Sequence, residues 1–130
     1  MSRSPSERFS LAWLWKWLLA AYALALVVGT HLPPAAIRVP IERTDKLLHF
    51  SAYAGLAFLL AIAWETSTGR LNGRHLRLLW MAIALFAVLD EVTQLLVGRD
   101  ATAGDWLADV LGAALGLVVF RVWQRWVGYT

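Results

Sequence analysis

The sequence predicts an all-α membrane protein, a polytopic bundle of four transmembrane helices. Of its 130 residues, 59% are apolar and only 16% are charged, a balance unlike that of soluble globular domains. The apolar residues gather in four stretches, near 11–29, 47–64, 78–97 and 105–121. Each stretch is long enough for a membrane-crossing helix, and short loops separate them. We therefore expect a single membrane domain over residues 1–130, with no room for a separate soluble domain.

Composition also excludes several classes of function. The chain has no cysteine, which excludes disulfides, thiol catalysis and cysteine-ligated metal sites. The net charge of +3 comes from basic residues scattered over the loops, so it does not indicate nucleic-acid binding.

The segments between the apolar stretches indicate where each of the four helices ends. The first helix has a basic start like a signal peptide, but no small-x-small cleavage site stands directly before His31, so we interpret it as a retained anchor. Pro33 to Pro40 cannot continue this helix and predicts an external linker. Gly69 to Gly73 and Gly98 to Gly104 mark the two remaining turns.

Basic residues predict the orientation. Eight of the twelve lie near the termini and in the middle loop: Arg3, Arg8, Lys16, Arg70, Arg74, Arg77, Arg121 and Arg125. By the positive-inside rule, both termini should be cytoplasmic. Seven tryptophans at the expected cytoplasmic ends of the spans are interpreted as interface anchors: Trp13, Trp15, Trp17, Trp64, Trp80, Trp123 and Trp126.

The segment DKLLHFSAY, residues 45–53, opens the second span. Asp45, His49 and Tyr53 recur every four residues and so share one helix face, with Lys46 beside them. The structural alternative makes Asp45 a helix N-cap and Lys46 an interfacial anchor, with His49 bonded to a neighbouring helix.

The segment DEVTQ, residues 90–94, lies inside the third span. Asp90 should lie roughly 10 Å below the end of that helix, at a rise of about 1.5 Å per residue. Ionisable groups at such depth are costly, which favours a functional interpretation of Asp90 and Glu91. The structural alternative is a salt bridge from this pair to Lys46 or Arg99.

The segment from Gly98 to Gly116 carries the third motif. Thr102 and Asp105 fit a capping box, and Asp109 lies one turn deeper, where capping does not apply. Gly112 and Gly116 form a GxxxG motif, which we expect to pack this helix against the second or third helix of the same chain.

Together these motifs predict one polar cluster at the outer end of the bundle. Its candidate ligand-binding residues are Asp45, Lys46, His49, Asp90, Glu91, Gln94, Arg99, Asp105 and Asp109. Five acids face two fixed cations and a histidine, so protonation, a bound cation or water must relieve the excess negative charge. A proton shared between Asp90 and Glu91 would suit general acid–base chemistry.

The ordered set of D-K-x-x-H at 45–49, D-E-x-x-Q at 90–94, and G-R followed by D-x-x-x-D-x-x-G-x-x-x-G at 98–116 resembles the VanZ-like family over residues 30–120. Its namesake is the teicoplanin-resistance accessory protein of glycopeptide-resistance clusters. The resemblance implies a small bacterial inner-membrane protein whose polar signature faces outward. Asp109 departs from the family pattern, since many relatives carry asparagine there.

Two functions remain open from the sequence. In the first, an envelope protein binds or moves the anionic head group of a phospholipid or a lipid-linked cell-wall precursor through Lys46, His49 and Arg99. In the second, a small intramembrane enzyme uses Asp90, Glu91 and His49 as catalytic groups. A divalent cation such as magnesium or calcium would then be held by His49 with Asp45, Asp105 or Asp109. A third interpretation is that the cluster only fastens the helices together. The expected partners are membrane lipids, and the chain is expected to be a monomer or small homo-oligomer.

Overall fold

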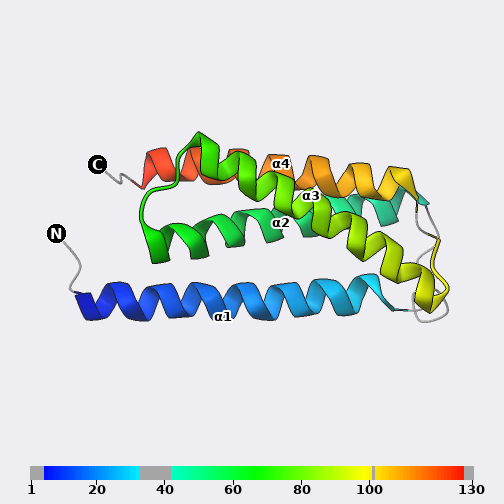
Figure 1. Cartoon of the computed structure of the whole chain (residues 1–130), viewed down its shortest axis with the longest axis horizontal. Coiled ribbons are helices and arrows are strands. Elements are labelled where there is room, and N and C mark those ends of the chain that lie inside the picture. Colours follow the sequence, from blue (N-terminus) through cyan, green and yellow to red (C-terminus); the bar gives the residue numbers. More distant parts are fainter. Residues whose placement is uncertain (1–4, 33–41, 101, 128–130) are drawn as a thin grey trace.

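The structure is a computed structural model that describes residues 5–32, 42–100 and 102–127. It has four long helices: α1 (Pro5–Thr30), α2 (Glu42–Thr68), α3 (Gly73–Gln94) and α4 (Ala103–Trp126), with the short 3-10 helix η2 (Leu95–Val97) extending α3 (Figure 1). No strand occurs in these described ranges. Each long helix contains a segment long and apolar enough to cross a membrane. The prediction of an all-α four-helix membrane bundle is confirmed.

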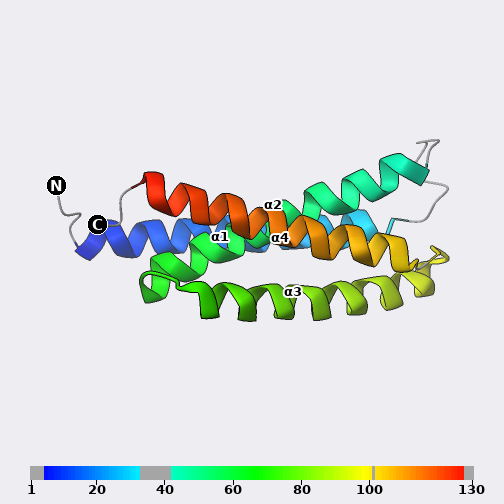
Figure 2. The same ribbon diagram turned by 90° about the horizontal axis from the view of Figure 1, so that it is seen from above.

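The helices run alternately up and down, so α2 and α4 are parallel to one another (Figures 1 and 2). These two helices make the most extensive contact in the molecule, while α1 packs mainly on α2 and α3 mainly on α4. The beginning of α1 and the end of α4 lie at the same end of the bundle (Figure 1). The opposite end therefore holds the beginnings of α2 and α4 and the end of α3.

The contact between α2 and α4 depends on two glycines. A Cβ atom at Gly112 would overlap the backbone carbonyl of Phe50, and one at Gly116 would overlap that of Ala54. The absence of a side chain lets the two backbones approach, which is the packing role of small residues in membrane helices. The expectation that GxxxG packs within the chain is confirmed, and α2 is its partner.

Two tryptophans fasten α3 to α4. The indole Nε1 of Trp80 donates to the carbonyl of Val110 at 3.0 Å, and that of Trp106 donates to Ala84 at 3.1 Å. Trp80 had been expected to mark the cytoplasmic interface. That interpretation stays a prediction, and the structure adds a second role, because the Trp80 indole also bonds between helices.

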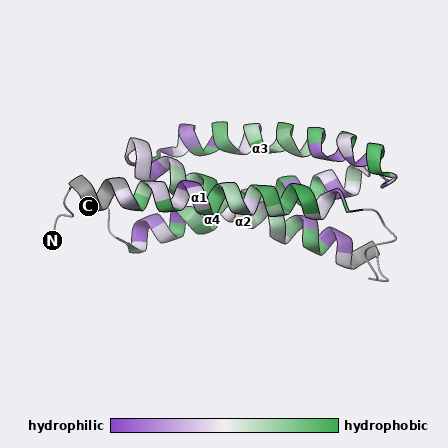
Figure 3. Ribbon diagram, turned by 90° about the horizontal axis from the view of Figure 1, so that it is seen from below, coloured by the Kyte–Doolittle hydropathy of each residue, from purple (hydrophilic) through white to green (hydrophobic). Residues whose placement is uncertain are grey.

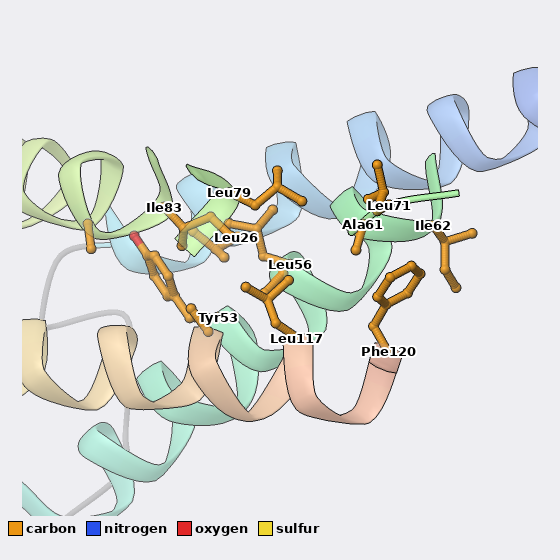
Figure 4. Packing of buried hydrophobic residues seen from close by; sticks show 13 residues of the cluster. Leu26, Tyr53, Leu56, Ala61, Ile62, Leu71, Leu79, Ile83, Leu117 and Phe120 are labelled. Carbon is orange, nitrogen blue, oxygen red and sulfur yellow. The ribbon is translucent and has the colours of Figure 1, made fainter. Parts of the chain in front are cut away.

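Apolar side chains fill the interior and also cover much of the outside. The core includes Tyr53, Leu56, Ile83 and Phe120, which belong to one apolar cluster that extends along the helices (Figure 4). Large apolar side chains such as Leu85 are also exposed, as expected for a surface that faces lipid. Green, hydrophobic positions dominate the middle of the helices in Figure 3, and purple positions occur toward their ends.

A polar brace closes the end of the bundle where α1 begins. Glu65 is buried and accepts from the backbone N–H of Leu71 at 2.9 Å and from the side-chain amide of Gln124. Gln124 also donates to the carbonyl of Leu71, and so does Arg121, each at 3.1 Å. These bonds tie the turn between α2 and α3 to α4, so this polar cluster has a structural explanation.

Candidate functional site

The nine predicted site residues all lie at the other end of the bundle, in or next to the beginnings of α2 and α4 and the end of α3. The structure brings them together there, as expected. Among the described residues, their direct side-chain hydrogen bonds and ion pairs fall into four groups, whereas one connected network had been expected.

The first group surrounds Asp90, which is 3% exposed. Its carboxylate accepts from the hydroxyls of Thr30 at 3.0 Å and Tyr53 at 3.1 Å, and from the amide of Gln94 at 3.2 Å. The Nδ1 atom of His31 lies 3.7 Å away. Asp90 is therefore held by donors from three helices, which satisfies the requirement that a buried carboxylate be hydrogen-bonded.

The contribution of α1 to this group was not predicted from the sequence. Thr30 ends α1 and His31 follows it. The His31 Nε2 atom lies 2.9 Å from the Thr93 hydroxyl of α3. The only sequence signal was their position just before the proline-rich linker. Tyr53 had been placed on the face of Asp45 and His49, and that spacing could have included it in the site.

The second group consists of His49, Glu91 and Asp109, all buried. The Nδ1 atom of His49 lies 2.9 Å from Asp109 Oδ1 and 3.8 Å from Glu91 Oε1. Within the described part of the chain, neither carboxylate oxygen of Glu91 has a hydrogen-bond partner, and nor does Oδ2 of Asp109. Buried polar atoms without partners are unusual and call for an explanation.

The third group is formed by Lys46, Asp105 and Thr102. The Lys46 Nζ atom binds Asp105 Oδ1 at 2.9 Å. Thr102 is the N-cap of α4: its hydroxyl oxygen accepts from the backbone N–H of Asp105 and its hydroxyl also bonds the Asp105 carboxylate. The capping interpretation of Asp105 is therefore confirmed for the Thr102 side, with an ion pair added to it.

The fourth group pairs Arg99 with Asp45 at 3.1 Å. Gly98 has a φ of 74°, a conformation that favours glycine, and it turns the chain after η2 so that Arg99 reaches α2. Because α2 begins at Glu42, Asp45 lies within the helix and is not its N-cap, so that alternative is wrong.

Two expectations about Asp90 and Glu91 need correction. Neither acid pairs with Lys46 or Arg99, because those cations bind Asp105 and Asp45. The structure also gives no support for a proton shared between Asp90 and Glu91. Adjacent residues point in different directions on a helix, and here Asp90 faces Tyr53 whereas Glu91 faces His49.

The fold and this site define a class of protein: a multi-pass membrane protein with an acid-rich polar cluster buried among the helix ends. The family model described as VanZ/LLP1 matches residues 8–124, so the chain belongs to the VanZ-like family. The resemblance inferred for residues 30–120 is confirmed, and the match also includes most of the first helix. Comparisons with curated proteins and with solved structures gave no match.

Proposed function

We propose that this VanZ-like protein lies in the bacterial inner membrane and uses its buried polar end to bind the anionic head group of an envelope lipid or lipid-linked cell-wall precursor. The observation that carries the proposal is the gathering of five acids, two fixed cations and a histidine at one end of a membrane-spanning bundle. His49 and four of the acids are buried, which is costly at membrane depth and favours a function over a simple brace. Binding or movement of such a precursor would be the route by which it contributes to glycopeptide (teicoplanin) resistance.

The position of Lys46 supports an anionic ligand. Its side chain is 48% exposed although it binds Asp105, whereas the Arg99 side chain is only 12% exposed. A partly exposed lysine ammonium can bind a phosphate while it keeps part of its contact with the carboxylate, and it need not leave the helix end to do so. Lys46 is therefore the residue that we expect an incoming head group to meet first.

Binding is tested with the full chain reconstituted in nanodiscs of phosphatidylcholine. Added phosphatidylglycerol or a polyprenyl phosphate should quench tryptophan fluorescence saturably, and Lys46→Gln should weaken that binding about tenfold, the effect of losing roughly 1.4 kcal/mol. Arg77→Gln, an exposed cation in the first turns of α3, is the matched control and should bind normally. Equal weakening by both variants, or no preference over phosphatidylcholine, would refute the proposed site.

The proposed orientation places both termini in the cytoplasm and the polar site outside. It is supported by the excess of basic residues around the beginning of α3 and the end of α4. We expect a membrane-impermeant maleimide to label Asp100→Cys, but not Gly73→Cys, in intact cells. The reverse labelling pattern would place the site on the cytoplasmic side and exclude a ligand confined to the outer leaflet.

The contact between Glu91 and His49 favours one alternative, an intramembrane enzyme at the outer leaflet. An unpartnered carboxylate 3.8 Å from an imidazole nitrogen can take up a proton and pass it on. Chemical turnover of a lipid head group by the purified protein would establish this alternative. Bound ligand recovered unchanged would favour binding or transport.

A further inference from the structure

We infer that His49, Glu91 and Asp109 form a binding site for one divalent transition-metal ion, of the zinc or manganese type. Each residue offers one ligand atom, and these atoms lie within 4.8 Å of one another. The three side chains come from α2, α3 and α4, so an ion would join the three helices.

The unpartnered oxygens are the observation that points to a ligand. Glu91 is 5% exposed and Asp109 is fully buried, yet three of their four carboxylate oxygens lack a hydrogen-bond partner within the described residues. The neighbouring buried acid Asp90 differs, because its carboxylate accepts three side-chain hydrogen bonds. An ion would supply the missing partner for both unsatisfied carboxylates.

The geometry is close to that of a coordinated ion. Ligand atoms about 2.1 Å from a tetrahedral metal are about 3.4 Å apart. The distances from His49 Nδ1 to Asp109 Oδ1 and Glu91 Oε1, 2.9 and 3.8 Å, lie on either side of that value. The Glu91 and Asp109 oxygens lie within 4.8 Å of each other, so these two side chains would have to move to complete the set. Binding would replace the proton on Nδ1 by the ion.

Charge and chemistry select the class of ion. Two carboxylates and a neutral imidazole carry a charge of −2, which one divalent cation neutralises at membrane depth. Imidazole nitrogen favours zinc and similar metals, while carboxylate oxygen is shared by most divalent ions. Of the partners that sequence analysis had considered for a cation with His49, Asp45 and Asp105 are paired with Arg99 and Lys46, and Asp109 alone remains.

Three protein ligands leave at least one coordination position open. This inference does not depend on the identity of the lipid ligand proposed above, because ion binding can be measured without one. If both proposals hold, a phosphate oxygen of the lipid could bind the ion at the open position. The ion would then add positive charge to that of Lys46 and Arg99, which is partly neutralised by their paired acids.

The test uses the full chain in detergent, with any affinity tag removed and metals stripped by chelator. Zinc or manganese should raise the melting temperature saturably, and metal analysis after dialysis should find one ion per chain. Glu91→Gln and Asp109→Asn should each weaken binding at least tenfold. Glu65→Gln, a buried acid at the opposite end of the bundle, is the matched control and should bind as the wild type does.

Two results would overturn the inference. One is a wild-type chain whose stability and metal content do not respond to zinc or manganese. The other is binding that persists unchanged in both Glu91→Gln and Asp109→Asn, because the ion would then lie elsewhere. Neither result bears on lipid binding to Lys46, which the nanodisc measurement tests separately.

Discussion

Gly112→Ala is expected to destabilise the bundle by about 1–3 kcal/mol, the usual cost of overfilling a packed contact, or by more if α2 has to move. The added Cβ would lie 2.8 Å from the carbonyl carbon of Phe50, closer than Cβ atoms approach in proteins, and 3.0 Å from its Cα, which is also unusually close. The obstructing atoms are backbone, so they can give way only if a whole helix shifts. Equilibrium unfolding in mixed detergent measures the change.

The sign of this result is informative because alanine is the better helix former. In a helix interior, glycine to alanine gains up to about 1 kcal/mol when nothing is in the way. Gly29→Ala is the matched control: that glycine is also helical, near the end of α1, and a Cβ there would have no neighbour within 4 Å. We expect Gly29→Ala to be neutral or stabilising. If Gly112→Ala behaves in the same way, the close packing of α2 on α4 is wrong.

The sequence allowed the helices and this contact to be predicted because both depend on local patterns. Apolar runs of sufficient length specify spans, and the spacing of Gly112 and Gly116 specifies a smooth face on α4. The spacing does not say which helix meets that face. That choice depends on how each helix is rotated about its axis, which is determined by packing of the whole bundle.

The partners of the charged side chains could not be predicted for a related reason. Lys46 and Arg99 have long, flexible side chains that can reach several acids at the same helix end. Their choice of Asp105 and Asp45 follows from the parallel arrangement of α2 and α4 and from the turn at Gly98. Sequence distance alone could not distinguish these pairs from pairs with Asp90 or Glu91.

Residues outside the charged motifs were also difficult to identify. Thr30 is one of the donors to Asp90, yet a hydroxyl at the end of a helix has many ordinary uses. Likewise, Gln124 gains its role in the brace only because the turn at Leu71 folds against α4. In both cases the signal is a contact between segments that are far apart in the sequence.

Asp90→Asn should lower stability whereas Glu91→Gln should not, although each removes one buried negative charge. The Asp90 oxygens accept from Thr30 on one side and from Tyr53 and Gln94 on the other. An asparagine NH₂ group must face one of these sides and leaves donors there unsatisfied, at a cost of about 1–3 kcal/mol. The Glu91 oxygens accept no such hydrogen bonds, so no donor loses its partner in Glu91→Gln. The neutral amide removes a desolvated charge and should leave stability unchanged or raise it.

The measurement is equilibrium unfolding of the chelator-treated protein, compared with a glycopeptide-susceptibility assay of the same variants in cells. If Glu91 works as a proton carrier or an ion ligand, Glu91→Gln should fold normally and still lose activity, because an amide neither exchanges a proton in the same way nor binds a cation as a carboxylate does. A stable Glu91→Gln protein with full activity would exclude an essential role for that carboxylate. Loss of folding in Glu91→Gln would instead mean that the carboxylate braces the three helices. The carboxylate would then make a stabilising contact that is not evident from its unpartnered oxygens.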